Sequence, residues 1–446
     1  MNIEQQFKFQ SYVNSLTKEM NIPHAIICVV NNEDTIMQIE TGSSSTNEKS
    51  VFPIACCTKI LTACGIHLSN LNIDIPLNSM TTTMPIFFEN NYVSSNITMR
   101  DLLTHRSGLH QNSLWVYLTN DLNIYQKSDK ISKLRISPFR YKYIYSNIAF
   151  SLIESYLSNI FKVHFNNFMA DLIFNKANMN DTCFFDNNDL RNAINIEPNI
   201  DINKKLKNHK IFNLHSLNAS SGIISSVSDI CSFMKYVLQN MNKFKNIFTP
   251  NIITDRRNIY KELSQETYAL GSYIQTIKGI DIIFHTGFSF GYSTFLGFIP
   301  SSKLGLFVFT NTDKSPFPSI LSFELIELLT GGENNKFKRR LQLERSISNN
   351  DKDSMHNAKF EYEQNKLRNQ KLYFEEFGLK GCIHICSEPI ITLNNTSFSL
   401  EQIGENVFRS YIEDVNDYMI VNISDDYINI SGTSDGDLIQ ISNFKR

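Results

Sequence analysis

FPIACCTKILTAC, residues 52–64, places two neighbouring cysteines and a lysine directly before a run with the pattern of a helix. Cys56 and Lys59 are three positions apart, a spacing that puts two side chains on the same face of a helix. The positive end of the helix and a nearby ammonium group would both favour the thiolate form of a thiol in the first turn. Cys56 is therefore a candidate nucleophile, but this short pattern also fits a buried thiol, a disulfide partner or a metal ligand.

The chain of 446 residues is 42% apolar and 19% charged, which allows a large core and argues against global disorder. Its net charge of -2 gives no electrostatic reason to expect a nucleic acid or an acidic membrane as partner. The N-terminal segment, residues 1–20, has the pattern of an amphipathic helix and lacks the apolar stretch of a secretory signal. The longest apolar runs, such as residues 25–30 and 304–309, are too short to cross a bilayer. We therefore expect a cytoplasmic protein.

The cysteines are scattered through apolar segments of a long chain. They are Cys28, Cys56, Cys57, Cys64, Cys183, Cys231, Cys382 and Cys386. In a reducing compartment we expect no disulfide framework, and Cys57 is expected to pack in the core on a different side from Cys56. Cys382, His384 and Cys386 would share one face of a predicted strand, but zinc takes four ligands and no fourth candidate is nearby in the sequence. The sequence thus predicts no metal site.

The pattern of apolar residues predicts strands at both ends of a helical middle. Residues 24–42 indicate two strands joined by a turn, and residues 267–311 return to strands after several helix-like blocks. The last of these blocks, VSDICSFMKYVLQNM, has Ser228 and Asp229 where a helix N-cap is expected. This order predicts an α+β fold in which the first and last parts of the domain build one sheet.

Three parts of the chain are expected from the changes in composition. Residues 1–334 carry the strands and helices of the main domain. Residues 335–370 are rich in charge and poor in core residues, which favours a partly helical linker. Residues 371–446 contain short strands with polar turns, which favours a small β domain, either a barrel or a sandwich.

Two further motifs follow the cysteine segment in the chain. Tyr145-Ser146-Asn147 precedes a predicted helix, and His285-Thr286-Gly287 lies on a predicted strand. With Cys56-Cys57-Thr58-Lys59 they resemble, in order, the Ser-x-x-Lys, Tyr-x-Asn and Lys/His-Thr-Gly signatures of the serine β-lactamase and penicillin-binding-protein superfamily, on its class C side, with related esterases, peptidases and acyltransferases.

Shorter matches between these motifs extend the resemblance over about residues 7–330. They are DLLTHRSGL (101–109), LIFNKANMNDTCF (172–184, without the family's Pro and Gly), ASSGIISSVSDI (219–230), YALGS (268–272) and TN (310–311). The resemblance implies a central antiparallel sheet flanked by helices, with a helical subdomain beside it. It also implies a covalent acyl-enzyme without metal or organic cofactor.

The resemblance implies a role for each residue that matches a motif. Cys56 stands where the family has its nucleophilic serine and would be acylated, while Lys59 would take or hold the proton. Tyr145 would be the general acid or base, with a phenol pKa lowered by Lys59 and by His285. His285, in place of the third-motif lysine, would shuttle protons or grip a substrate anion.

The resemblance also implies which groups hold the substrate. Asn147, Thr286, Gly287 and Phe288 would line the binding site. The backbone N–H groups of Cys56 and Phe288 would form the oxyanion hole.

The cysteine at position 56 departs from the family pattern and leaves three readings. It could be a catalyst with changed chemistry, a dead site kept for binding, or an engineered replacement. Because the other motif residues are present, we expect an active site. A thioester is attacked by amines more readily, relative to water, than an oxyester is, so we expect acyl transfer or amide or peptide bond formation rather than β-lactam hydrolysis.

Two alternatives to this function stay open at the level of sequence. The first is a cysteine-nucleophile esterase, amidase or peptidase, and the second is an inactive protein that binds ligands in the same cleft. In each case the expected partner is a small-molecule or peptidyl acyl group, including one presented as a thioester by a carrier protein.

Overall fold

The computed structural model describes the main part of the chain in segments. They are residues 3–42, 50–110, 122–134, 136–185, 198–202, 205–208, 217–254, 265–277, 279–289, 291–329, 370–376, 379–385, 390–393, 396–404, 407–412, 417–423, 427–434 and 437–445.

An eight-stranded antiparallel sheet forms the centre of the fold, in the order β2-β1-β13-β12-β11-β10-β9-β8. The strands are β1 (His24–Val30), β2 (Thr35–Gly42), β8 (Ile252–Ile253), β9 (Thr267–Tyr268), β10 (Tyr273–Ile277), β11 (Ile280–Ser289), β12 (Tyr292–Ile299) and β13 (Leu304–Thr310). β1 pairs with β13, so that Ala25 lies opposite Thr310. The prediction that the two ends of the domain build one sheet is confirmed.

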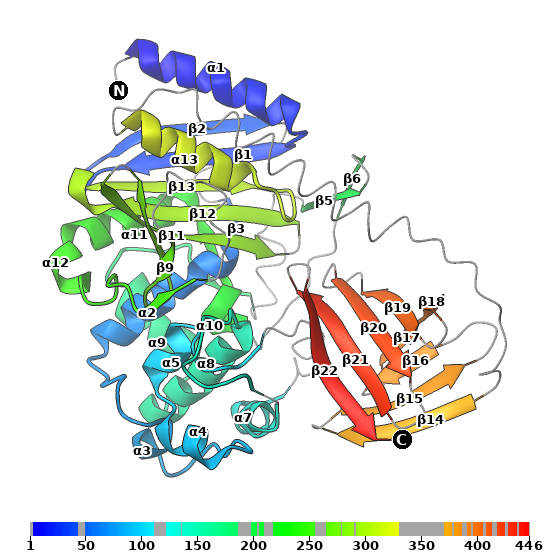
Figure 1. Ribbon diagram of the computed structural model, residues 1–446. Helices are drawn as coiled ribbons and strands as arrows, with labels where there is room; N and C mark the ends of the chain where they lie inside the picture. The colour runs from blue at the N-terminus through cyan, green and yellow to red at the C-terminus, as the bar shows by residue number, and fades with distance from the viewer. Residues whose placement is uncertain are drawn as a thin grey trace.

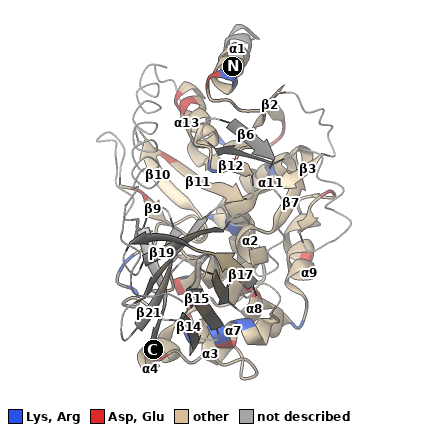
Figure 2. Ribbon diagram, turned by 90° about the vertical axis from the view of Figure 1, so that its right-hand side faces the viewer, with Lys and Arg blue, Asp and Glu red and all other residues tan. Residues whose placement is uncertain are grey.

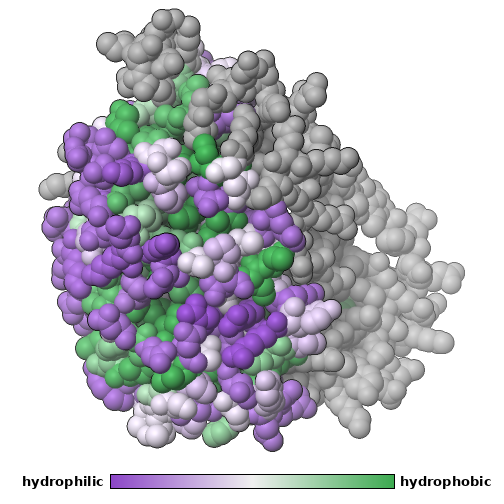
Figure 3. Space-filling view, turned by 60° about the vertical axis from the view of Figure 1, so that its left-hand side comes forward, coloured by the Kyte–Doolittle hydropathy of each residue, from purple (hydrophilic) through white to green (hydrophobic). Residues whose placement is uncertain are grey.

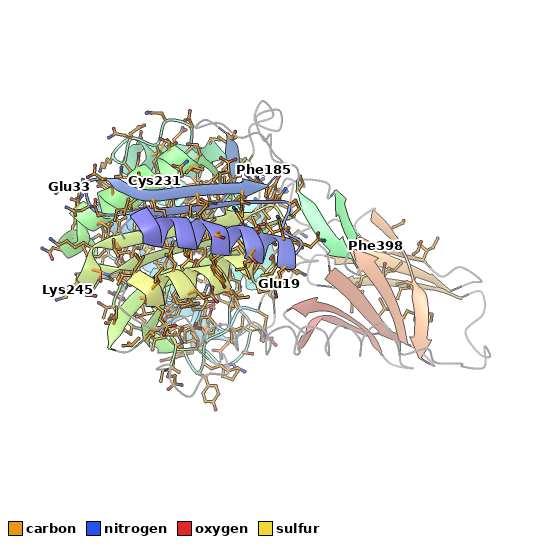
Figure 4. All side chains as sticks on the ribbon, turned by 90° about the horizontal axis from the view of Figure 1, so that it is seen from above. Glu19, Glu33, Phe185, Cys231, Lys245 and Phe398 are labelled. Atoms are coloured by element: carbon orange, nitrogen blue, oxygen red, sulfur yellow. The ribbon has the colours of Figure 1, made fainter. Side chains whose placement is uncertain are left out.

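Helices cover both faces of this sheet because its strands are apolar on both sides. In β1, Ile26, Cys28 and Val30 belong to one buried cluster, and the alternating residues, such as Ile27 and Val29, belong to another. This two-residue period is that of a strand with both faces buried. α1 (Ile3–Glu19) and α13 (Phe317–Leu329) cover one face and lie side by side in Figure 4. α2 (Thr58–Leu68) and α11 (Val227–Gln239) pack against the other.

A helical region continues from the second face of the sheet, below it in Figure 1. Its elements are α3 (Leu77–Met80), α4 (Asn91–Asn96), α5 (Met99–Leu103), α7 (Ile124–Ser132), α8 (Asn147–Phe161), α9 (Phe165–Met169), the π-helix η2 (Ala170–Phe174), α10 (Asn218–Ser221) and α12 (Met241–Phe244). The short connecting elements are β3 (Val51–Pro53), η1 (Ala55–Cys57), β4 (Cys183–Phe184), β5 (Asn199–Ile202), β6 (Lys205–Asn208), β7 (Ile223–Ser226) and η5 (Pro300–Ser302). This arrangement is the α+β fold expected from the sequence.

The start of α11 differs from the sequence prediction. The N-cap is Ser226, whose hydroxyl accepts a hydrogen bond from the backbone N–H of Asp229 at 3.2 Å. Asp229 lies in the first turn, where its carboxylate accepts from the N–H of Asp181 and the hydroxyl of Thr182, both at 2.7 Å. The prediction of Ser228 and Asp229 as caps is therefore wrong, because β7 ends at Ser226 and the helix already begins at the next residue.

The C-terminal strands form two further antiparallel sheets, β14-β15-β16-β17 and β18-β19-β20-β21-β22. They are β14 (Gln370–Glu376), β15 (Leu379–Ile385), β16 (Ile390–Leu393), β17 (Thr396–Ser399), β18 (Glu401–Gly404), β19 (Val407–Ile412), β20 (Asp417–Ile423), β21 (Tyr427–Ser434) and β22 (Asp437–Lys445). The predicted linker, apart from Gln370, lies outside the described residues, as do Cys386 and the side chains of Cys382 and His384. The domain boundaries stay a prediction.

The surface of the described part is mixed in character. Charged residues are dispersed along the ribbon in Figure 2, in keeping with the small net charge of -2. On the face shown in Figure 3, groups of apolar residues are separated by polar residues. Within the described ranges, none of the helices has the length and apolar character needed to span a membrane.

Candidate active site

Cys56 lies in a tight turn between a strand and a helix. η1 follows β3 and leads directly into α2. Ala55 has a φ of 48°, in the left-handed region that residues other than glycine seldom adopt. Ala55 and Cys57 are buried, whereas Cys56 is partly exposed. The turn therefore presents the Cys56 thiol at the surface of an otherwise packed segment.

Gly287 lets β11 approach this turn closely. A Cβ atom at Gly287 would lie 2.3 Å from Oγ1 of Thr294 and 2.9 Å from both the Ala55 Cβ and the Ile54 carbonyl oxygen. Real Cβ atoms do not approach so closely, so only glycine fits here without displacement. The close approach brings the third motif beside the Cys56 turn.

Lys59 is fully buried and fixed by hydrogen bonds. Its Nζ donates to Oδ1 of Asn147 at 2.6 Å and to the carbonyl oxygen of Ser220 at 3.1 Å, and lies 4.9 Å from the ring centroid of Tyr145. Burial lowers the pKa of Lys59, an effect that the charge of Cys56 and a side-chain hydrogen bond to it oppose. The ammonium group is thus easier to deprotonate than an exposed one, and Cys56 lies near enough to affect its pKa.

Tyr145 also lies near Cys56. Its hydroxyl donates to Oδ1 of Asn147 at 3.3 Å and interacts electrostatically with the cysteine. Burial, followed by the charge of Cys56, raises the pKa of Tyr145 well above its ordinary value. The expected lowering of this pKa by Lys59 and His285 is therefore wrong, because loss of water around the phenol outweighs the nearby positive charge. The phenol stays protonated at neutral pH.

His285 lies behind Tyr145, with a ring centroid 6.3 Å from that of the tyrosine, and is 1% exposed. Its Nδ1 lies 2.5 Å from the carbonyl oxygen of Thr286, and its Nε2 lies 3.1 Å from the hydroxyl of Tyr268. The partners of both ring nitrogens are therefore protein groups.

The other third-motif residues and Cys57 take different positions. Thr286 is partly buried, and Phe288 is 42% exposed, which is high for a large apolar side chain. Cys57 is buried, with Sγ 3.2 Å from the His285 carbonyl oxygen and 3.3 Å from Oγ1 of Thr294. Burial raises the pKa of Cys57 to about 12, so this thiol is unreactive, and the prediction that it packs in the core is confirmed.

His105 braces the tyrosine motif in a way that the sequence did not indicate in detail. Its Nδ1 accepts from the N–H of Ser146 at 3.2 Å, and its carbonyl oxygen accepts from the N–H of Ile144 at 2.7 Å. Its ring centroid lies 4.6 Å from that of Tyr145. These contacts give His105 a structural role in holding the tyrosine motif.

Two other supports of the site were missed at the level of sequence. The Ser220 carbonyl that holds Lys59 belongs to α10, which Thr62 also contacts by donating to the Ala219 carbonyl at 2.9 Å. Tyr268 belongs to the quoted YALGS stretch, but the stretch carries no sign that its hydroxyl reaches His285. Within the described ranges, no group of three or more His, Cys, Asp or Glu side chains is arranged to hold a metal ion.

Comparisons with known proteins agree with this geometry. A family model described as Beta-lactamase matches residues 9–330. The chain is 21% identical over 321 residues to Protein flp of Staphylococcus aureus (strain MRSA252), covering 68% of this chain and 62% of that protein. It is 20% identical over 329 residues to the Unguisins hydrolase ungD' of Aspergillus campestris (strain IBT 28561), covering 69% of this chain and 62% of that protein. The match thus spans less than two thirds of the length of these relatives.

A solved structure shares the fold over almost the whole chain. The octameric penicillin-binding protein homologue from Pyrococcus abyssi matches with a TM-score of 0.65 and 17% identity, covering 96% of this chain and 98% of that one. At this identity the likeness concerns the fold, and it includes the C-terminal strands as well as the domain that carries Cys56.

Proposed function

Because the chain belongs to the beta-lactamase family, we propose that it is an enzyme that transfers acyl groups through a thioester on Cys56. The observation that carries this proposal is the partly exposed Cys56, which lies near enough to Lys59 and Tyr145 to influence the pKa of both. A nucleophile, a basic amine and a phenol gathered in one cluster are the groups that acyl transfer needs.

The directions of the pKa shifts suggest how the first half of the reaction proceeds. Lys59, in its neutral form, takes the proton from Cys56, and the thiolate attacks the carbonyl carbon of the donor. The backbone N–H groups of Cys56 and Phe288 hold the oxyanion that forms. The C–X bond of the donor then breaks, and the proton from Lys59 reaches the leaving group through the Tyr145 hydroxyl, so that the leaving group departs neutral.

The second half of the reaction returns the enzyme to its starting state. An amine attacks the thioester carbonyl, and the bond between Sγ of Cys56 and the acyl carbon breaks. The thiolate leaves, and the proton lost by the amine returns to it through Lys59. Asn147, which accepts hydrogen bonds from both Lys59 and Tyr145, keeps the two proton carriers in place.

Hydrolysis is the second candidate function, with water in place of the amine. One observation favours it, since a relative at 20% identity is a hydrolase by name. We favour transfer because the nucleophile is a thiol. Compared with an oxyester, a thioester has a stronger preference for amines over water.

Intact-mass measurement after exposure to acyl thioesters tests the proposal. We expect an adduct of the acyl mass on Cys56 that is absent from Cys56→Ala and present in Cys183→Ala, since Cys183 is another partly exposed cysteine of the described chain. Added amines should then give amides. Free acid as the only product would favour the hydrolase, and reversible binding without any adduct would favour a binding protein.

A further inference from the structure

The proton positions on His285 follow from its neighbours. A carbonyl oxygen can only accept a hydrogen bond, so Nδ1, at 2.5 Å from the Thr286 oxygen, carries a proton. In the neutral ring, Nε2 is then without a proton and accepts from the hydroxyl of Tyr268 at 3.1 Å. Both nitrogens of the ring are thus occupied inside the protein.

Tyr268 is held firmly in the position that makes this contact. It is fully buried, and its ring packs edge to face against Tyr273, with centroids 4.7 Å apart. The rings of His105 and Tyr143 lie at 4.9 Å and 5.3 Å. A tyrosine enclosed on several sides by rings cannot turn its hydroxyl away from His285 without disturbing the packing.

A substrate carboxylate needs a cation or a hydrogen-bond donor when it leaves water. The family pattern places that group at position 285, but in the neutral ring of His285 the one N–H donates to the Thr286 carbonyl. Phe288, three residues further along β11, offers exposed apolar surface instead.

From these contacts we infer that His285 and Tyr268 are positioning residues and that the site selects acyl donors without a carboxylate. His285 packs behind Tyr145 and keeps the phenol in place, while Tyr268 keeps His285 in one tautomer. This inference rests on the proposed acyl-enzyme function and names the class of donor that it takes: a neutral thioester, ester or amide.

A matched pair of donors tests the selectivity. N-benzoylglycyl thioesters of mercaptoacetamide and of mercaptoacetate differ in one carboxamide and one carboxylate. Each rate of Cys56 acylation is divided by the rate at which the same donor acylates free N-acetylcysteine, which removes the difference in leaving group. We expect the carboxamide donor to react at least about tenfold faster, the value of one lost hydrogen bond to a charged group. Equal rates, or a faster carboxylate donor, would overturn the inference.

A variant tests whether Tyr268 is the cause. Tyr268→Phe keeps the ring and removes the hydroxyl, which frees Nε2 of His285 to take up a proton and donate to an anion. We expect the preference for the carboxamide to fall at least about threefold. Tyr156→Phe is the matched control, since Tyr156 is also buried and its hydroxyl donates to Asn78 at 3.4 Å, outside the site. A preference unchanged in Tyr268→Phe would contradict the role of Tyr268.

Binding to Cys56→Ala separates this inference from the proposed function, because that variant cannot be acylated. Calorimetry with the same two thioesters should show at least about tenfold tighter binding of the carboxamide. If the wild-type protein forms no adduct while this preference persists, the acyl-transfer proposal fails and the selectivity stands. If the carboxylate binds equally well, or the carboxamide does not bind, the selectivity fails. If Tyr268→Phe does not fold, the acylation rates of the wild-type protein and the calorimetry on Cys56→Ala still test the inference.

Discussion

At the scale of single residues, burial sets the chemistry of the groups around Cys56. Burial disfavours the charged form of both Lys59 and Tyr145, so it lowers the pKa of the lysine and raises the pKa of the tyrosine. A larger fraction of the amine is thus neutral and able to accept a proton, and the phenol keeps its proton. This division of roles is a consequence of the packed surroundings.

A lysine that acts as the base gives a clear pH dependence. We expect acylation of Cys56 to rise with pH and to level off below pH 10.5, the ordinary lysine pKa, since the pKa of Lys59 is lowered. Lys59→Arg keeps the positive charge but cannot lose its proton, so the rate should fall about 10²–10⁴-fold. Rates from intact-mass time courses between pH 6 and 10 check this. Lys133→Arg, at an exposed lysine, should behave as wild type; a fast Lys59→Arg enzyme would refute the role of Lys59 as base.

A second buried group, away from the site, should make the stability of the protein fall in acid. His24 begins β1 and is fully buried, and burial lowers its pKa to about 4, although Glu40 lies 3.3 Å from its Nε2. The unfolded chain therefore binds more protons than the native one between about pH 4 and the ordinary histidine value of 6.5, and stability falls as the pH drops through this range.

The variant His24→Leu should lose this acid sensitivity, which is at most about 1.4 kcal/mol per pH unit. Urea unfolding midpoints at several pH values between 4 and 7 measure it. The exposed His164, which caps α9, provides the control His164→Asn, because asparagine can keep the cap. An unchanged pH slope in His24→Leu would show that other groups cause the sensitivity.

At the scale of elements, the site depends on how closely β11 packs against η1. The hydroxyl of Thr294, on the neighbouring strand β12, donates to the Ile54 carbonyl at 2.9 Å, and Cys57 reaches the His285 carbonyl. Two segments more than 200 residues apart in the chain thus meet at the nucleophile, with Gly287 between them. The position of Cys56 therefore depends on residues of both segments.

Gly287→Ala should therefore lower both stability and activity. The added methyl group would push β11 away from the turn, at a cost of about 1–3 kcal/mol in unfolding free energy. A displacement of the nucleophile by about 1 Å can lower a rate about 100-fold, so Cys56 acylation should fall by that order. Gly279→Ala is the control, since no atom lies within 4 Å of a Cβ there although its φ is 81°. That variant should lose only stability, and equal acylation in both variants would contradict the argument.

At the scale of the whole molecule, the domain that carries the candidate site lies within the first three quarters of the chain. Its two large buried clusters lie on opposite faces of the central sheet. α1 and α13 cover the cluster that contains Ile27 and Val29. Tyr12 of α1 forms a short hydrogen bond with the buried Glu324 of α13, which ties the two ends of the domain together. The family model ends in the same place, at residue 330.

A chain of residues 1–334 should therefore fold without the C-terminal strands. We expect a single cooperative thermal transition by circular dichroism and a rate of Cys56 acylation similar to that of the full chain. A truncated protein that is unfolded, or that folds but forms no adduct, would show that the C-terminal strands are needed for the fold or for the site. The full chain under the same conditions is the reference.

The order of the three motifs and the alternation of apolar residues were enough to predict the sheet and its two-ended construction. They also named Cys56, Lys59, Tyr145, Asn147 and His285 as candidate site residues. Such patterns are local, and they indicate which residue types a strand, a helix or a motif requires. The start of α11, the carbonyl of Ser220 behind Lys59 and the tie from Tyr268 to His285 were decided by the tertiary structure. So was the direction of the Tyr145 pKa. Each of these depends on which distant groups exclude water and which polar atoms then face one another, and no spacing along the chain carries that information.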